Sequence, residues 1–147
     1  MITVTHYGVP VPKGRPRAAK AGTFISFYTP KKTRDFEAAL KVTMAETMHL
    51  EAYDAPFKGP LVCSMLVDLP IPVSWKRSKA EDARSGALRP WGRPDLDNYL
   101  KVAMDAGNNV LWYDDGQIVQ CTVGLWYSDK PKMTITAEPW ITTKMES

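Results

Sequence analysis

The chain has 147 residues, of which 44% are hydrophobic and 24% are charged, with a net charge of +3. This composition excludes an intrinsically disordered chain, and there is no run of about 18 or more apolar residues that would predict a membrane span. We expect one domain over residues 1–140 and a frayed tail over residues 141–147, with no targeting leader.

The first third of the chain predicts two strands followed by a helix. Alternating apolar residues predict a strand from Ile2 to Val9, and a second apolar run predicts one from Phe24 to Tyr28. Thr29 and Pro30 form a helix start signal. The apolar residues that follow recur at helical spacing and are expected to face the core: Phe36, Leu40, Met44 and Met48.

The remainder predicts a strand, a helix, a strand and a hairpin. Apolar residues alternate over residues 61–69 and 119–127, and again over residues 133–137 after a turn at Ser128 to Pro131. This order is typical of a single-domain α+β fold, in which two main helices pack on one mixed sheet. Cys63 and Cys121 fall on apolar strand faces, so we expect two buried thiols rather than a disulfide.

Residues 93–117, RPDLDNYLKVAMDAGNNVLWYDDGQ, contain the most informative polar pattern. Asp95 and Asp97 stand at the predicted start of a helix that ends near Gly107, and the pair Asp114–Asp115 follows. Carboxylates held close together repel one another unless a cation lies between them. Grouped hard oxygen ligands suit Mg²⁺ or Mn²⁺. The segment therefore indicates metal-assisted attack on a phosphate ester.

Helical spacing determines which of these charged side chains lie together. Asp97, Lys101 and Asp105 are each four residues apart and share one face of the predicted helix. The opposite face is apolar and consists of Leu96, Tyr99, Leu100, Ala103 and Met104. A short extended run from Val110 to Tyr113 then delivers Asp114–Asp115. If this run returns beside the helix start, three carboxylates and one ammonium meet at one point.

Each part of the pattern also has an ordinary structural explanation. An Asp-x-Asp at a helix start is more often an N-cap than a metal ligand. A helical Asp-Lys-Asp stripe is usually a surface ladder of ion pairs worth about 0.3–0.5 kcal/mol each. Asp-Asp-Gly is usually a turn. Taken from the residues alone, the metal-site and structural interpretations are balanced.

The strings PDLDNYLKVAMDA and VLWYDDGQIV resemble the signature of RusA-type Holliday junction resolvases, small Mg²⁺-dependent endodeoxyribonucleases of bacteria and prophages. The family pattern is Asp-x-Asp-Asn, a Lys four residues after the second Asp, an Asp four residues after the Lys, and Asp-Asp-x-Gln. This chain fills each of these positions. The stretches GVPVPKGRPRAAKAG and IPVSWKRSKAEDARSG also match, so the resemblance runs from about Gly8 to about Thr136.

The resemblance implies roles for particular residues. Asp95, Asp97 and Asp115 would bind Mg²⁺, for which Mn²⁺ can substitute, and Lys101 would be the catalytic lysine. The segment from Gly107 to Tyr113 is one residue shorter than in some members, so Asp114 is an alternative ligand to Asp115. An ammonium at Lys101, held by Asp105 one turn on, suits the charge that develops when a phosphodiester is hydrolysed.

The resemblance also implies a biological setting. It predicts a homodimer that nicks four-way DNA junctions symmetrically, leaving 5′-phosphate and 3′-hydroxyl ends, in recombination, repair or phage DNA processing. A two-fold dimer has the same symmetry as the junction. The helix from Phe36 to Met48 and the C-terminal hairpin are the candidate interfaces. We further expect a bacterial or prophage-encoded protein that is cytoplasmic and associated with the nucleoid.

Basic residues are concentrated in two stretches, residues 1–34 and 74–93, which hold thirteen of the 19 Lys and Arg residues. Their Gly, Pro, Ser and Ala content predicts mobile loops. Such loops suit DNA because they neutralise backbone phosphates, although they also favour solubility. The residues expected to contact DNA are Lys13, Arg15, Arg17, Lys20, Lys31, Lys32, Lys76, Arg77, Lys79 and Arg93. Trp75 and Trp91 bracket the second stretch and either stack on unpaired bases or anchor the loop ends.

Two other functions remain open from the sequence. A non-catalytic junction-binding protein would keep the basic stretches but would have no use for Lys101 and the aspartates. A metal-dependent phosphohydrolase acting on a small phosphate ester would keep the carboxylates but would not need thirteen basic residues in two stretches. Steep salt dependence of binding would favour DNA over a small ester.

Overall fold

The computed structural model describes residues 1–14 and 17–141, so residues 142–147 of the predicted tail lie outside the described residues. The elements in chain order are β1 (Ile2–Tyr7), β2 (Arg17–Ala21), β3 (Phe24–Tyr28), α1 (Lys31–Leu50), β4 (Leu61–Pro70), α2 (Arg77–Ser85), α3 (Leu96–Gly107), the 3₁₀ helix η1 (Asp115–Gln117), β5 (Ile118–Ser128) and β6 (Lys132–Pro139). None of the helices in these ranges has the length and apolar character needed to cross a membrane.

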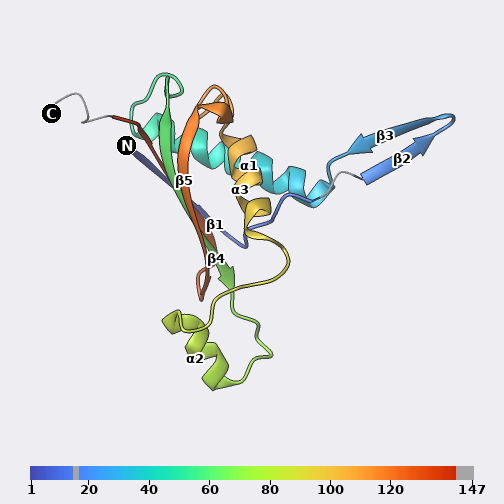
Figure 1. The fold of residues 1–147 in the computed structure, drawn as a ribbon, viewed down its shortest axis with the longest axis vertical. Coiled ribbons are helices and arrows are strands. Elements are labelled where there is room, and N and C mark those ends of the chain that lie inside the picture. The colour runs from blue at the N-terminus through green and yellow to red at the C-terminus, as the bar shows by residue number, and fades with distance from the viewer. Residues whose placement is uncertain (15–16, 142–147) are drawn as a thin grey trace.

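A four-stranded mixed sheet forms the centre of the fold. Its strand order is β1-β6-β4-β5, in which β4 and β5 are parallel and the other neighbours are antiparallel. α1 and α3 lie on one face of this sheet, and the opposite face carries no helix from the described part of the chain (Figure 1). The predicted α+β class, with two main helices on one mixed sheet, is confirmed.

The core fills the space between this sheet and its two helices. Alternate residues of β1, β4 and β6 face inward, as expected for strands that are covered on one side. The α1 stripe that faces them is buried as predicted and consists of Phe36, Leu40, Met44 and Met48. Burying a side chain of this size contributes about 1.5–3 kcal/mol. Because the chain's own core occupies this stripe, only the exposed face of α1 stays available for the predicted dimer interface.

The two cysteines are neighbours across the parallel pair of β4 and β5. Both are free thiols, with Cys63 buried and Cys121 half-buried. Burial and, to a smaller degree, the adjacent Cys121 raise the pKa of Cys63 to about 12. A thiol that stays protonated in this way packs as a small apolar side chain, in agreement with the predicted strand faces.

β2 and β3 form a separate two-stranded hairpin that projects from the body of the molecule (Figure 1). The prediction of a strand at Phe24–Tyr28 is confirmed, but its partner β2 lies in a stretch that was predicted to be a mobile loop. All five residues of β3 are exposed. Such a hairpin is marginally stable by itself, so pairing gives it its shape without adding to the core.

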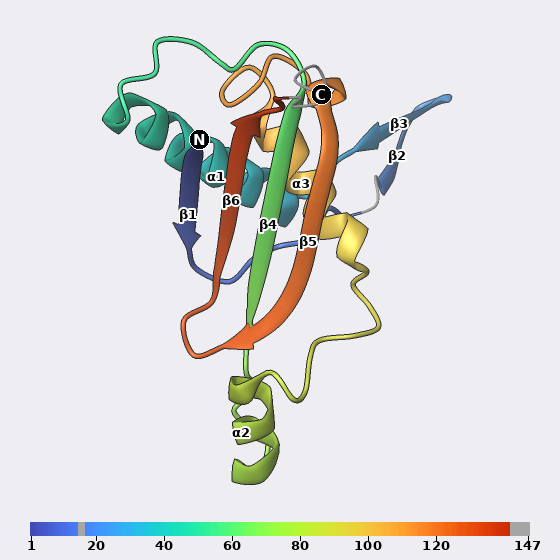
Figure 2. The ribbon, with the colours of Figure 1, turned by 60° about the vertical axis from the view of Figure 1, so that its left-hand side comes forward.

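The second basic stretch, also predicted as a mobile loop, contains the helix α2. α2 lies beyond one end of the sheet (Figure 2) and ends at Gly86, which adopts φ 84° as a left-handed C-terminal residue. Two contacts attach this lobe to the sheet. The rings of Trp75 and Tyr127 meet edge to face at 5.2 Å, and Arg84 Nε lies 2.8 Å from Asp129 Oδ2. With these contacts, α2 and the residues beside it form an ordered lobe, called the α2 lobe below.

Candidate active site

The predicted acidic pair lies at the start of α3. Asp95 occupies the N-cap position with an extended backbone, but its side chain makes no capping hydrogen bond. Its carbonyl instead accepts a hydrogen bond from the Asn98 N–H at 3.1 Å. Asp97 follows in the first helical turn, where the helix dipole favours a negative charge. Both carboxylates are exposed, and capping uses neither of them.

The face of α3 that enters the core differs slightly from the predicted stripe. The buried residues are Tyr99, Val102, Ala103, Ala106 and Gly107. Leu96 is 39% exposed, so the buried face is displaced toward Val102 and Ala106. Asp97 and Lys101 lie on the exposed side of α3, as the four-residue spacing predicted.

The predicted pairing of Lys101 with Asp105 is wrong. Lys13 Nζ lies 3.0 Å from Asp105 Oδ2 and 3.1 Å from Glu37 Oε1, and thereby links α3 to α1. The Lys13 N–H also donates to the Asn98 carbonyl at 2.9 Å, which fixes the incoming chain along α3. Burial by itself lowers the pKa of Lys13, but hydrogen bonds and charges from the two carboxylates outweigh burial and leave this pKa raised.

Lys13 therefore has a structural role that the sequence did not reveal. Lys13→Met is expected to destabilise the fold by about 1–2 kcal/mol, since it leaves two half-buried carboxylates, Glu37 and Asp105, without their cation. Urea unfolding measures this loss. The control Lys31→Met removes only an exposed pair with Asp35 and should cost about 0.5 kcal/mol or less. Unchanged stability together with weakened DNA binding would instead support Lys13 as the predicted DNA contact.

The segment after α3 is a tight turn rather than the predicted extended run. The N–H groups of Leu111 and Trp112 both reach the Gly107 carbonyl, at 2.9 and 3.3 Å. The Trp112 indole is fully buried against Gly107, and a methyl group at residue 107 would overlap the ring. Its Nε1–H donates to Asn108 Oδ1 at 3.0 Å. Burial of this large ring outweighs the strand propensity of the run.

Asp114 and Gln117 build the short helix that follows. Asp114 Oδ2 accepts a hydrogen bond from the Gly116 N–H at 2.9 Å, and Gln117 Oε1 accepts one from the Asp114 N–H at 3.0 Å. Gln117 Nε2 also donates to the Phe57 carbonyl at 2.8 Å. This structural role was not predicted, although a capping box with Gln three residues after Asp is a known signal. Asp115 makes no side-chain contact of this kind with any residue that the structure describes.

The structure does not bring the predicted carboxylates together in one cluster. Asp95 lines the same cavity as Val123–Leu125 in the middle of β5, whereas Asp115 lies in η1, before the first residue of β5, Ile118. At 3.3 Å per residue, Ile118 and Val123 are about 16 Å apart along the strand. Figure 2 accordingly shows α3 starting beside the middle of β5. Within residues 1–14 and 17–141, no three His, Cys, Asp or Glu residues form a group that could hold a metal ion.

The donor chemistry at the α3 start nevertheless suits Mg²⁺. In sites that process phosphates, Mg²⁺ is commonly held by one or two carboxylates, with water and substrate phosphate as the other ligands. Asp95 and Asp97 are both exposed and satisfy that requirement without a third carboxylate. The complete set of Asp95, Asp97 and Asp115 stays a prediction.

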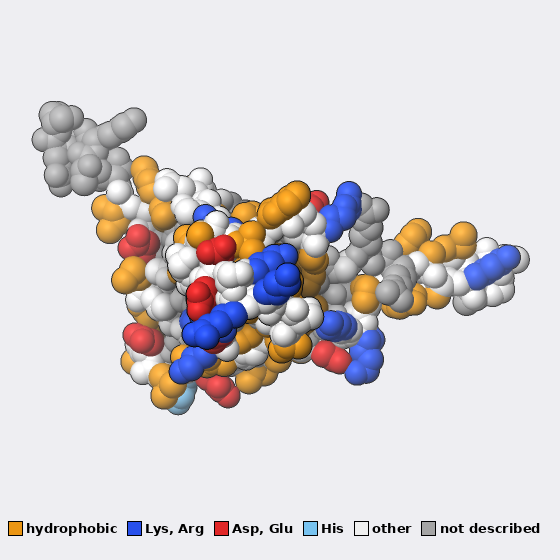
Figure 3. All heavy atoms as spheres, turned by 90° about the horizontal axis from the view of Figure 1, so that it is seen from below, with side chains coloured by type: hydrophobic (Ala, Val, Ile, Leu, Met, Phe, Trp, Pro, Cys, Tyr) orange, Lys and Arg blue, Asp and Glu red, His pale blue; other side chains and the backbone are white. Residues whose placement is uncertain are grey.

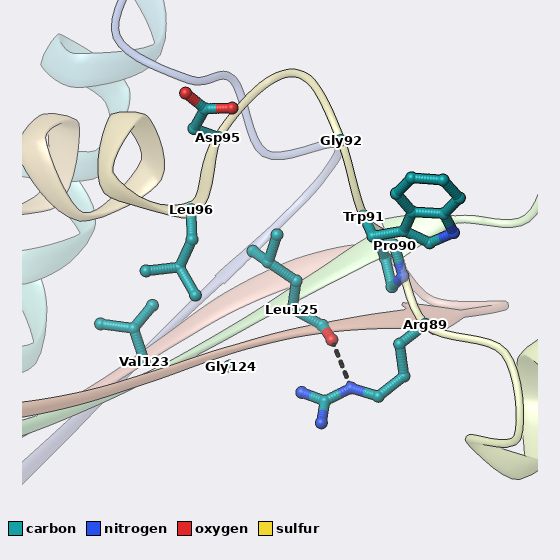
Figure 4. A pocket seen from close by; sticks show the side chains of 9 residues that line it. All are labelled: Arg89, Pro90, Trp91, Gly92, Asp95, Leu96, Val123, Gly124 and Leu125. Atoms are coloured by element: carbon teal, nitrogen blue, oxygen red, sulfur yellow. Dashed lines mark hydrogen bonds between the residues drawn. The ribbon is translucent and has the colours of Figure 1, made fainter.

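A cavity of about 380 Å³ opens beside Asp95, between the loop of residues 89–92, the first residue of α3 and the middle of β5 (Figure 4). Arg89 attaches the loop to the sheet, since its Nε–H donates to the Leu125 carbonyl at 2.9 Å. The Arg89 guanidinium also lies 3.7 Å from the centre of the Trp126 ring. Asp95 itself lines this cavity.

The residues predicted to contact DNA are spread over several parts of the fold. Those with described side chains are exposed, apart from Lys13: Lys20 on β2, Lys31 and Lys32 at the α1 start, Lys76, Arg77 and Lys79 at the α2 start, and Arg93 beside Asp95. Arg15 and the side chain of Arg17 lie outside the described part. Figure 3 looks onto the α2 lobe and shows Lys and Arg side chains there, with acidic side chains among them. Arg77, for example, pairs with Glu81 at 3.2 Å.

Comparison with known proteins identifies a matching family and a similar protein. The family model described as "Endodeoxyribonuclease RusA" matches residues 8–138, which include α3, η1 and the cavity beside Asp95. The "Uncharacterized protein YqaN" of Bacillus subtilis (strain 168) is 34% identical over 136 residues. That alignment covers 91% of this chain and 93% of the Bacillus protein.

Proposed function

The chain belongs to the family of the endodeoxyribonuclease RusA, and from this premise we propose that it is a Mg²⁺-dependent resolvase of four-way DNA junctions. It nicks two opposing strands symmetrically and leaves 5′-phosphate and 3′-hydroxyl ends. Its substrates arise during recombination or repair of a bacterial genome, or during processing of prophage DNA.

One observation carries this proposal. Among the charged side chains of the acidic segment, two are used by the fold: Asp105 binds Lys13, and Asp114 caps η1. The four residues that the resemblance assigns to catalysis are Asp95, Asp97, Lys101 and Asp115. Within the described residues, none of these four side chains forms an ion pair or a side-chain hydrogen bond. Arg93 also forms neither within the described residues, so the carboxylates and the ammonium left available for chemistry are the ones that the family pattern selects.

Each available group has a role in hydrolysing a phosphodiester. Asp95 and Asp97 would hold Mg²⁺, which when bound neutralises phosphoryl oxygens and lowers the pKa of water. The family resemblance adds Asp115 as a third carboxylate, and η1, which carries Asp115, contacts α3. The rigid start of α3 fixes the separation of Asp95 and Asp97. The exposed ammonium of Lys101, one turn further on, stabilises the negative charge that develops as the phosphodiester bond breaks.

Recognition of the substrate rests on the two basic stretches of the chain and on the second subunit of a homodimer. Lys20, Lys32, Lys76 and Arg93 are exposed and stand apart from one another, so they can neutralise phosphates on different arms of a junction. A homodimer places two sites about a two-fold axis, which matches two opposing strands. Contacts to phosphates fix the position of the protein and leave the choice of substrate to the shape of the junction.

The proposal is tested with a synthetic four-way junction and a linear duplex of the same sequence, each in Mg²⁺, Mn²⁺ or EDTA. We expect paired symmetric nicks on the junction, products that DNA ligase reseals, and no cleavage in EDTA. Junction binding should weaken steeply with salt, because each neutralised phosphate contributes a slope of about −0.9 in log K against log salt.

Two outcomes would point to the other functions. Tight junction binding without nicks in either metal would identify a non-catalytic junction-binding protein. Neither binding nor cleavage of DNA, together with metal-dependent hydrolysis of a small phosphate ester that salt hardly affects, would identify a phosphohydrolase.

A further inference from the structure

The two tryptophans of the second basic stretch have different surroundings. Trp75 packs edge to face on Tyr127, and Lys79 Nζ lies 4.1 Å from the centre of its ring, so Trp75 anchors the α2 lobe. Trp91 is 89% exposed and has no such partner among the residues described. Of the two interpretations that the sequence left open, anchoring therefore applies to Trp75 and leaves Trp91 unexplained.

The loop that carries Trp91 is fixed on both sides. Before it, Arg89 is attached to the Leu125 carbonyl and lies on the Trp126 ring. After it, Gly92 turns the chain with φ 97°, a conformation that side chains disfavour, and Asp95 begins α3. Trp91 is thus presented at a defined place on the surface, at the cavity that Asp95 also lines.

The cavity next to Trp91 has walls that suit a flat apolar ring. Figure 4 shows Leu96, Val123 and Leu125 on one side and the loop with Trp91 and Gly92 on the other. Gly124, between Val123 and Leu125, contributes only backbone to the lining. The surface that lines the cavity is mostly apolar, so it does not suit a phosphate or a sugar. Its volume of about 380 Å³ is in the range typical of small-ligand sites.

We propose that Trp91 and this cavity bind an unstacked nucleobase of the strand whose phosphate lies at Asp95. The inference rests on the proposed function, and it assigns to the site a base-binding element. A base leaves the stack most cheaply where pairing and stacking are already disturbed, as they are at the branch point of a junction. Binding of a base at the branch point would thereby place the phosphate of that strand at Asp95.

The surroundings of the cavity favour DNA over a second protein chain as the occupant. Arg93 is exposed two residues after Trp91, and Asp95 is exposed two residues further on. Charged residues are depleted from the centres of protein–protein interfaces. A cation beside an aromatic ring is instead the usual combination in sites for single-stranded nucleic acid, where the ring stacks on a base and the cation binds phosphate.

The test compares Trp91→Ala and Trp91→Phe with the control Trp140→Ala. Trp140 is also an exposed indole, at 48%, and lies after β6, away from the cavity. Affinity for the junction and for the linear duplex is measured in EDTA. Trp91→Ala should weaken junction binding about 5- to 100-fold, which corresponds to the loss of one base–aromatic stack. Binding of the duplex should hardly change, Trp91→Phe should restore most of the affinity, and Trp140→Ala should match the wild type.

Fluorescence of 2-aminopurine locates the base that Trp91 contacts. Binding of a single-stranded oligonucleotide then tests this inference separately from the proposed function. With 2-aminopurine placed in turn at each base beside the branch point, the wild type should change the emission at one position, and Trp91→Ala should abolish that change. A short single-stranded oligonucleotide presents unstacked bases even if junctions are not the substrate, and Trp91→Ala should weaken its binding too. Equal binding of this oligonucleotide by wild type and Trp91→Ala would overturn the inference. So would dissociation of a dimer by Trp91→Ala in sedimentation, which would assign the surface to a second chain.

Discussion

Asp97→Asn is expected to lower the rate of junction cleavage by about 10²–10³-fold or more while leaving junction binding within about threefold of the wild type. The amide has almost the same shape as the carboxylate but lacks the charge that holds a metal ion. Asp97 is exposed and none of its side-chain atoms takes part in a hydrogen bond with the described residues, so its replacement should leave the fold intact. Single-turnover cleavage and anisotropy measure the two quantities on one junction.

The pair Asp114 and Asp115 supplies the matched control. Asp115→Asn should lose cleavage as Asp97→Asn does. Asp114→Asn should stay close to wild type, because an amide oxygen can still accept the Gly116 N–H that now caps η1. Loss of cleavage in Asp114→Asn with Asp115→Asn active would reverse the assignment of the ligand. Full activity in Asp97→Asn would contradict the proposed metal site.

Local patterns in the sequence predicted the elements that hold the site. The helical stripe of α1 and the start of α3 at Asp95 follow from residues that are close together in the chain. Ion pairs between residues that are far apart in the chain cannot be predicted from such local patterns. Asp105 is four residues from Lys101 but binds Lys13, because the backbone of Lys13 is tied to Asn98 and carries its ammonium between two helices.

In the two basic stretches, local composition failed to predict regular structure that is present. Their Gly, Pro, Ser and Ala content predicted loops, yet α2 forms because Ala80 and Ala83, three residues apart, are buried against the rest of the fold. Gly86 at its end was an available signal for a helix stop. β2 offered no comparable signal, since Ala and Lys have low strand propensity, and it exists because β3 provides a partner.

The placement of Asp115 was the least predictable part of the site. It depends on whether the chain after α3 extends or turns, and burial of one ring decides this. The short run from Val110 to Tyr113 was predicted to be extended, but Trp112 gains more by packing on Gly107 than a strand would provide. The turn then sets the position of η1, and with it the distance of Asp115 from the α3 start.

The turn after α3 therefore predicts an unusual response to a small substitution. Gly107→Ala normally stabilises a helix by about 1 kcal/mol, but here the added methyl group would overlap the buried Trp112 ring, so we expect a net loss of about 1–3 kcal/mol. Trp112→Ala, which leaves a cavity where the buried indole was, should lower the free energy of unfolding by about 3–5 kcal/mol. Urea unfolding measures both losses.

A double-mutant cycle identifies the cause of that loss. Trp112→Phe alone should destabilise the chain, but it makes room for the methyl group, so adding Gly107→Ala to it should cost less than it does in the wild type. Because Leu111 and Trp112 both bind the Gly107 carbonyl, Gly107→Ala should also displace η1 and Asp115, and slow cleavage more than it weakens binding. A Gly107→Ala chain as stable as the wild type would mean that the ring of Trp112 does not hold this turn.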